Sequence, residues 1–228
     1  LADLATRFCP EFESRHFEDD SSTVVEHFGQ SFRWNPDLHQ TPAQLEPLRL
    51  QGDEQMDAAL EELDPMPGED TLVAMQRAAP DGAAARLLAS LSAEPAWLDW
   101  SMLERGQRVY LRYLPAASLT LFNMSLVGGF SAPKITKVLE QSGYLVGSPA
   151  AVMRRLFDTG RLLVDACAHG PAALRPGGRG WRAAVRVRAL HAKVRRRLQR
   201  RERGWDVQTY GVPINQEDMA ATLLAFSY

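Results

Sequence analysis

The sequence predicts an all-α protein, a helical bundle preceded by a loosely structured acidic N-terminal arm. From Leu72 onward, apolar residues recur three and four positions apart, which is the spacing of an amphipathic helix. No run of alternating β-branched residues competes with this pattern. The 228-residue chain is 45% hydrophobic, which is enough to bury a core. We therefore expect a polar, proline-containing arm over residues 1–70 and a helical domain over residues 71–228.

Helix start and stop signals divide the chain into segments. In the arm, the pattern predicts one short helix from Asp53 to Leu63, and a helix pair follows over 72–91 with a break at Pro80-Asp81-Gly82. Further helices are expected from a Ser101-x-x-Glu104 capping box to about Leu114, from Ser131 to a stop at Gly143, from Ser148 to about Ala168, from Trp181 to about Arg203, and from Asn215 onward with Met219, Leu223 and Phe226 in the core.

The most apolar stretch runs from Leu114 to Phe130. Asn123, Ser125 and a pair of glycines interrupt it, so it predicts a core helix and not a membrane span. No window of the given sequence combines a basic start, an apolar run and a small-residue cleavage site, the pattern of a signal peptide. The two cysteines lie far apart and lack metal-ligand spacing, which favours neither a disulfide framework nor a zinc site. An intracellular, reducing compartment is the default expectation.

Charge is distributed unevenly along the chain. Residues 1–81 hold 18 Asp and Glu against 5 Lys and Arg, whereas residues 175–203 hold 12 Lys and Arg against one Glu. The basic segment could bind nucleic acid through phosphate groups. Because no aromatic interleaving or groove-binding motif accompanies it, a solvated helix end, favoured by the C-terminal helix dipole, is the preferred interpretation. No nucleic-acid partner is therefore expected.

His191 is the foremost candidate for chemistry. It lies four residues after Val187 and three before Val194, so its imidazole shares the apolar stripe of its predicted helix and points inward. Spacing alone leaves two interpretations open, a core histidine bonded to a backbone carbonyl or a metal ligand. Arg188 and Arg195 stand one turn to either side. Two cations flanking a neutral imidazole would suit a porphyrin, whose propionates need positive partners.

The preceding predicted helix holds a second candidate set. Thr159 shares a face with three apolar residues, which aims its hydroxyl at the core, and Arg155 lies one turn before it. One interpretation is that Thr159 bonds the carbonyl four residues earlier while Arg155 extends to water. The other is that both side chains face a buried, propionate-bearing ligand.

Six motifs occur in order over residues 97–228. They are Glu104-Arg105-Gly106-Gln107, Ser125-Leu126-Val127-Gly128-Gly129-Phe130-Ser131-Ala132-Pro133, Gly143-Tyr144-Leu145, Arg155-Leu156-x-x-Thr159, Arg186-Val187-Arg188-x-Leu190-His191-Ala192-x-Val194-Arg195, and Tyr210-Gly211-x-Pro213-Ile214-Asn215-Gln216-Glu217-Asp218. Together they resemble the motifs of the rubber-oxygenase catalytic domain, which also occurs in the endoplasmic-reticulum-bound oxygenase of mycophenolic acid biosynthesis. The acidic arm is loosely similar to the N-terminal part of fungal members.

The resemblance implies a helical bundle that holds haem b, with His191 as the proximal iron ligand and with Arg155 and Thr159 supporting the haem pocket. Members cleave carbon–carbon double bonds of polyisoprene or of a prenyl side chain with dioxygen. In one branch a lysine just before that threonine is an axial ligand; here the residue is Asp158. A glutamate proposed as a base in that branch corresponds by spacing to Glu140, although a solvated helical Glu is the alternative interpretation.

The hypothesis from the sequence is therefore a haem b-dependent oxygenase that uses dioxygen to cleave an isoprenoid or other apolar substrate, with Arg188 and Arg155 neutralising the propionates. Two alternatives stay open. One is a non-enzymatic helical module whose basic face over 175–203 binds nucleic acid or an acidic partner. The other is a family member that has lost its cofactor. The chain starts without a Met and ends on an apolar segment, so we expect a C-terminally truncated fragment.

Overall fold

The computed structural model describes residues 23–27, 30–34, 41–63, 68–143, 147–200 and 204–227. Its contacts divide the chain into two units, Leu1–Leu45 and Glu46–Tyr228. Residues 46–63 therefore belong to the second unit. The division expected from the sequence at residue 70, which was based on composition, stays a prediction.

The first unit contains an antiparallel hairpin, which the sequence did not lead us to expect. Strand β1 (Thr23–His27) pairs with β2 (Gln30–Trp34), and Thr23 is opposite Trp34 while His27 is opposite Gln30. The short helix α2 (Pro42–Leu45) follows. The strands hold β-branched and aromatic residues, which fit a pleated ladder. The rest of the expected arm before residue 41 lies outside the described residues.

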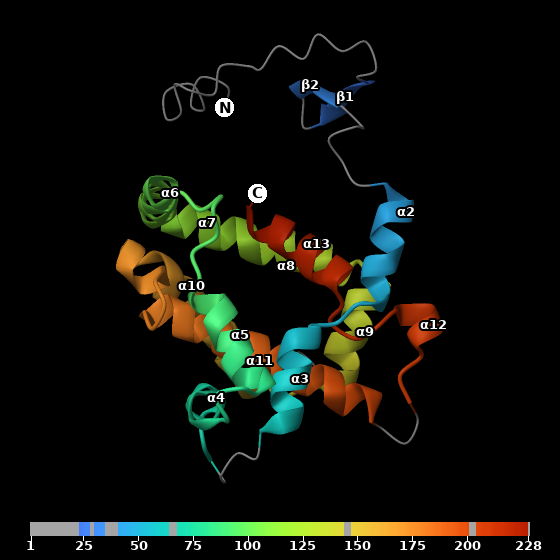
Figure 1. Cartoon of the computed structure of the whole chain (residues 1–228). Helices are drawn as coiled ribbons and strands as arrows, with labels where there is room; N and C mark the ends of the chain where they lie inside the picture. The colour runs from blue at the N-terminus through green and yellow to red at the C-terminus, as the bar shows by residue number, and fades with distance from the viewer. Residues whose placement is uncertain are drawn as a thin grey trace. The chain divides into compact units, whose positions relative to one another are not determined.

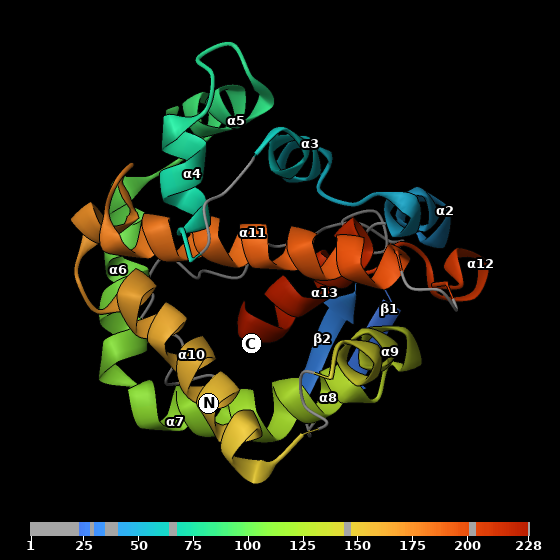
Figure 2. The same cartoon turned by 90° about the horizontal axis from the view of Figure 1, so that it is seen from below.

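The second unit is all-α, as predicted, and is organised around α11 (Arg179–Gln199). The 3₁₀ turn η2 (Glu46–Leu50) leads into α3 (Glu54–Glu62), which is followed by α4 (Thr71–Arg77) and α5 (Ala83–Ser92). Helices α3 and α4 pack on α11, and α5 packs on α3 and α4. In Figure 1 these segments run from blue to green along the colour bar, and in Figure 2 all three helices lie on one side of α11 while α10 lies on the other.

The remaining helices form the other part of this unit. They are α6 (Trp100–Arg112), α7 (Leu114–Thr120), the π-helical turn η3 (Leu121–Ser125), α8 (Leu126–Phe130), α9 (Pro133–Ser142), α10 (Pro149–Cys167), the 3₁₀ turn η4 (Pro171–Leu174), α12 (Val207–Tyr210) and α13 (Gln216–Ser227). Helix α10 packs on both α6 and α11, and α13 packs against η2, η3 and α8. No helix among the described residues is long and apolar enough to cross a membrane.

Most helix ends fall where capping chemistry predicts them. Gly143 ends α9 with a φ of +71°, a backbone conformation that glycine adopts without strain, and the Ser148 hydroxyl caps α10. Asn215 caps α13 by accepting a hydrogen bond from the Asp218 N–H at 2.9 Å. The predicted capping box at Ser101 is wrong because Asp99 is the N-cap of α6, and its carboxylate accepts from the Ser101 N–H.

Two predictions of burial are also wrong. The segment from Leu114 to Phe130 is helical, but it is not a core helix, because Leu119 is 65% exposed and Phe122 and Val127 are also exposed. Helix α13 does not carry its predicted residues into the core, since Leu223 is 71% exposed and Met219 is exposed as well. The side chain of Phe226 lies outside the described residues. Apolar spacing shows which residues share a face, but it does not show that another element covers that face.

Candidate functional site

His191 lies on α11, two turns before the end of the helix. Its imidazole is partly buried, and within the part of the chain that the structure describes it has no hydrogen-bond or ion-pair partner. Burial lowers the pKa of His191, and the nearby Arg195 charge lowers it further against the opposing effect of Asp53. The side chain is therefore a neutral imidazole at pH 7 with its ring nitrogens uncommitted. A metal ligand needs this form of histidine.

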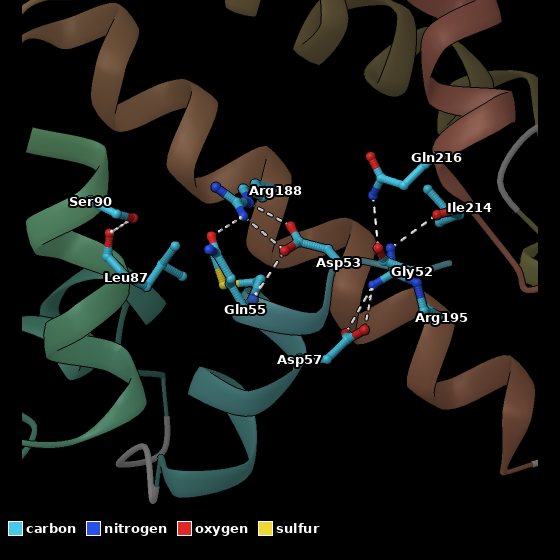
Figure 3. A network of polar contacts seen from close by, with 11 residues as sticks. Gly52, Asp53, Gln55, Asp57, Leu87, Ser90, Arg188, Arg195, Ile214 and Gln216 are labelled. Atoms are coloured by element: carbon cyan, nitrogen blue, oxygen red, sulfur yellow. Dashed lines mark hydrogen bonds and ion pairs between the residues drawn. The ribbon is translucent and has the colours of Figure 1, made fainter. Parts of the chain in front are cut away.

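Arg188, one turn before His191, is held by the N-terminal end of α3. Its Nε and Nη2 donate to the two carboxylate oxygens of Asp53, and Nη2 also donates to Oε1 of Gln55 at 3.3 Å (Figure 3). The same Asp53 carboxylate caps α3 by accepting from the Met56 N–H at 3.0 Å. These bonds use two of the three guanidinium nitrogens. Nη1 has no partner among the described residues, so it could bind another anion.

Arg195, one turn after His191, is the most deeply buried cation in this region, with 3% of its surface exposed. Its Nη1 donates to both carboxylate oxygens of Asp57 at 2.9 Å. Its Nε and Nη2 donate to the backbone carbonyls of Pro213 and Ile214 at 3.1 and 3.0 Å. Figure 3 shows Arg195 between Asp57 and Ile214. All three nitrogens and four of the five N–H donors are used, so Arg195 is a structural link between α3, α11 and the segment before α13.

The uneven charge along the sequence is partly explained by these contacts. Acidic residues of the segment 53–70 pair with basic residues of α11, and the Arg186–Asp70 ion pair at 2.7 Å extends the pattern beyond Asp53 and Asp57. These carboxylates were not predicted as members of the site. The signal was available, because Asp53 and Asp57 are four residues apart and share a helix face, as do Arg188 and Arg195, which are seven apart.

The second predicted set lies on α9 and α10. Arg155 is partly buried and donates from Nη1 to the Gly143 carbonyl at 2.6 Å, which ties α10 to the C-cap of α9. Thr159 and Asp158 are exposed, so the prediction that the Thr159 hydroxyl faces the core is wrong. Glu140 is exposed on α9 and pairs with Lys137 at 3.0 Å, as expected for a solvated helical glutamate. The roles predicted for these residues stay predictions.

The predicted site residues therefore fall into two groups. Arg188 and His191 are adjacent turns of one helix, braced by α3. Arg155 and Thr159 are adjacent turns of α10, which packs on α11. The two helices also hold exposed apolar side chains, including Leu190 on α11 and Met153 and Phe157 on α10, and Phe157 is 70% exposed. These side chains could contact an apolar molecule.

The residues present fit a porphyrin better than a site built from protein ligands alone. Among the described residues, no three His, Cys, Asp or Glu side chains come together as a metal site. A porphyrin supplies four iron ligands itself and needs from the protein a neutral imidazole such as that of His191. Arg188 Nη1 could pair with a propionate, whereas all three nitrogens of Arg195 already have partners. The residues fit haem through His191 and Arg188.

The fold and the site define a helical protein in which a neutral imidazole and a guanidinium donor lie on adjacent turns of one helix. Comparison with protein families gives the particular family: a model described as ER-bound oxygenase mpaB/B'/Rubber oxygenase, catalytic domain, matches residues 109–228. This is more than half of the chain, and the chain belongs to this family of oxygenase catalytic domains, as the sequence motifs indicated. No curated protein and no solved structure matches the chain.

Proposed function

We propose that this oxygenase domain depends on haem b and uses dioxygen to cleave a carbon–carbon double bond of an isoprenoid or other apolar substrate. The observation that carries the proposal is the His191 imidazole, which is partly buried, neutral and without a partner in the described part of the chain. Neither ring nitrogen is committed to a protein group in the described part of the chain, so the neutral imidazole is available to a metal.

Each residue of the site has a separate role in this proposal. His191 coordinates iron through one ring nitrogen, and Arg188, oriented by Asp53, binds a propionate through Nη1. Arg195 holds α11 against α3 and so fixes the position of the His191 imidazole relative to α3. Arg155 joins α9 to α10, and Thr159, one turn further on, is proposed to contact the haem pocket. Glu140 is the weakest member of the set because it is exposed and paired with Lys137.

Bound haem supplies the redox chemistry by which dioxygen can react with an unactivated double bond. In the overall reaction, an alkene and one dioxygen give two carbonyl compounds. Both oxygen atoms end in products, so no external reductant is required. The chain's own contribution is to orient the substrate, and the exposed apolar side chains of α10 and α11 suit an isoprenoid, which has no charge to pair.

The first test is the absorption spectrum of purified protein reconstituted with haemin. We expect a Soret band typical of histidine ligation in the native chain and its loss or marked shift in His191→Ala. His169→Ala is the matched control because His169 is an exposed histidine just after α10, and its spectrum should equal that of the native chain. A Soret band that is the same in all three proteins would remove His191 from its proposed role.

The second test concerns the substrate. Haem-loaded protein is incubated with squalene under ¹⁸O₂, and the products are analysed by mass spectrometry. Cleavage predicts pairs of carbonyl products that each contain one labelled oxygen. Labelled hydroxyl or epoxide products without chain scission would show an oxygenase with another outcome, and would contradict the cleavage proposal while leaving the haem proposal intact.

A further inference from the structure

A pocket of about 340 Å³ lies where the C-terminal part of α11 meets the end of α3 and the start of α4. Its wall combines two leucines, one threonine and four cations. The lining residues are Leu60, Leu63, Thr71, Lys193, Arg196, Arg197 and Arg200. A volume of this size is in the range of small-molecule sites. Among the residues that the structure describes, no carboxylate belongs to the lining, so these residues give the pocket a positive charge.

The three arginines of this pocket differ from three other arginines of α11. Arg186, Arg188 and Arg195 each pair with an aspartate. Arg196, Arg197 and Arg200, by contrast, form no ion pair or hydrogen bond with any residue that the structure describes, although Arg196 lies near enough to Asp57 to act on it electrostatically. Three neighbouring guanidiniums without a bonded carboxylate repel one another. A bound anion would relieve this repulsion.

A hydrogen bond between two polar side chains lies at the rim of the pocket. The Lys193 ammonium donates to the Thr71 hydroxyl oxygen at 2.5 Å, which fixes both side chains at the rim. The hydroxyl oxygen is the acceptor in this contact, so the Thr71 O–H is left to donate to a ligand oxygen. A ligand with several acceptor oxygens, such as phosphate, could bind the hydroxyl and the guanidiniums together.

Leu60 and Leu63 give the pocket an apolar side. Both are partly buried residues of the α3 end that pack against the main core cluster. Inorganic phosphate would leave them uncovered, whereas a phosphate with an attached hydrocarbon would cover them and gain from removing apolar surface from water. We propose that this pocket binds an amphiphilic phosphate, with the phosphate group on Arg196, Arg197 and Arg200 and an alkyl segment against Leu60 and Leu63.

The pocket is separate from the proposed iron site. At 100° per residue, Lys193, Arg196, Arg197 and Arg200 lie on the side of α11 opposite to His191. An amphiphilic phosphate bound there would not contact the imidazole. The proposal therefore does not depend on haem, and it can fail or succeed independently of the proposed oxygenase reaction.

The test is isothermal titration calorimetry of the 228-residue chain with octyl phosphate, used below its critical micelle concentration. We expect saturable binding that weakens with added salt, and a loss of affinity of about tenfold or more in the double variant Arg196→Gln/Arg200→Gln. Arg182→Gln is the matched control because Arg182 is an exposed cation near the other end of α11 and is not part of the lining. Its affinity should stay within about twofold of the native value.

Two comparisons can overturn the proposal. Inorganic phosphate that binds as tightly as octyl phosphate would contradict the role of the two leucines. Equal losses of affinity in the Arg182→Gln and Arg196→Gln/Arg200→Gln proteins would show unspecific charge attraction. A single-stranded oligonucleotide that binds more tightly than octyl phosphate, and that loses equal affinity in both variants, would show a nucleic-acid surface instead. Absence of octyl phosphate binding to the native chain would also refute the site.

The source of the phosphate is distinguished by vesicles. Phosphatidylcholine vesicles with added phosphatidic acid are sedimented with the native and variant chains. Co-sedimentation that is lost in Arg196→Gln/Arg200→Gln but kept in Arg182→Gln supports the pocket and identifies a lipid headgroup as its ligand. Octyl phosphate binding without co-sedimentation also supports the pocket and identifies a soluble amphiphile.

Discussion

The two sides of the second unit differ in how completely their apolar residues are covered. On the side of α3, α4 and α5, the core cluster contains Met56, Ala59, Leu72, Met75, Ala84 and Leu87 together with Val185, Ala189 and Ala192 of α11. On the side of α6 to α8, α10 and α13, large apolar residues such as Leu119, Phe157 and Leu223 are mostly exposed. The main core cluster is therefore completed by residues 46–92, which precede the family match at 109–228.

The main core thus joins α11, which lies within the matched segment, to α3–α5, which precede it. The match identifies an oxygenase domain, and α3 and α4 supply one of the faces against which its helix α11 packs. Substitutions of buried residues on the α3–α5 side should therefore weaken the fold strongly, and matched substitutions of exposed residues on the other side should be nearly neutral.

The largest effect is expected at Arg195. Arg195→Met keeps much of the volume but leaves the Asp57 carboxylate and two backbone carbonyls without their partner. Removing one member of a buried ion pair costs about 3–5 kcal/mol. Urea unfolding monitored by circular dichroism should show this loss. A loss below about 1 kcal/mol would mean that Arg195 does not hold α11 against α3.

The next prediction compares one buried and one exposed side chain directly. Met75→Ala removes a side chain that is 1% exposed, and we expect a loss of about 2–4 kcal/mol in the free energy of unfolding. Leu119→Ala removes a side chain of similar size on the other side of the unit, and the change should stay within about 0.5 kcal/mol. Equal losses would show that both sides are equally well packed.

Two glycines sharpen the comparison at the contact between α10 and α11. A Cβ on Gly180 would lie 2.8 Å from the Asp165 carbonyl oxygen and 2.9 Å from the Ala166 Cα, so Gly180→Ala should cost about 1–3 kcal/mol. Gly160, inside α10, has no atom within 4 Å of such a Cβ, and Gly160→Ala should stabilise the helix by about 0.5–1 kcal/mol. Thermal unfolding measures whether each variant is more or less stable than the native chain. A Gly180→Ala protein that is as stable as Gly160→Ala would contradict the close approach of α11 to the backbone at Asp165 and Ala166.

A further effect, which depends on pH, is expected from the charge of Asp53. Burial acts to raise the pKa of this carboxyl group, but the hydrogen bonds from Arg188 and the Met56 N–H outweigh burial, and the pKa is lowered. A carboxyl group with a lowered pKa stabilises the fold above its ordinary pKa, and this contribution is lost as the pH falls through the folded-state pKa.

Asp53→Asn keeps an N-cap residue and removes the charge. The variant should be less stable than the native chain by about 1 kcal/mol at pH 7, and the difference should shrink as the pH falls below about 4. Urea unfolding between pH 3 and pH 7 measures it. A difference that does not change with pH would show that the charge of Asp53 contributes nothing.

The sequence predicted local structure better than burial. Helix ends were predictable at Gly143, Ser148 and Asn215 because capping depends on a few adjacent residues. The exposure of Leu119 and Leu223 was not predictable, because it depends on which faces other helices cover. The hairpin over 23–34 was missed because its two strands are short and lie in a polar, acidic region.

In the candidate site, too, local features were predictable and long-range contacts were not. His191 and Arg188 were predictable from helical spacing and from the family motif, and the structure places them on adjacent turns of α11. Asp53 and Asp57 were missed because they lie more than 130 residues away in sequence from the arginines that they bind. Long-range ion pairs leave only a complementary spacing of charges in the sequence, and many other pairings would satisfy that spacing.

The most direct test of the central claim is rescue of the iron ligand in His191→Gly by free imidazole. Removing the side chain leaves a space that an exogenous imidazole can enter. After haemin loading, we predict that the variant lacks the Soret band of the native protein and recovers it as imidazole is added, while Arg155→Gln and Thr159→Val retain the band without imidazole. A His191→Gly protein with the native spectrum before imidazole is added would contradict the account.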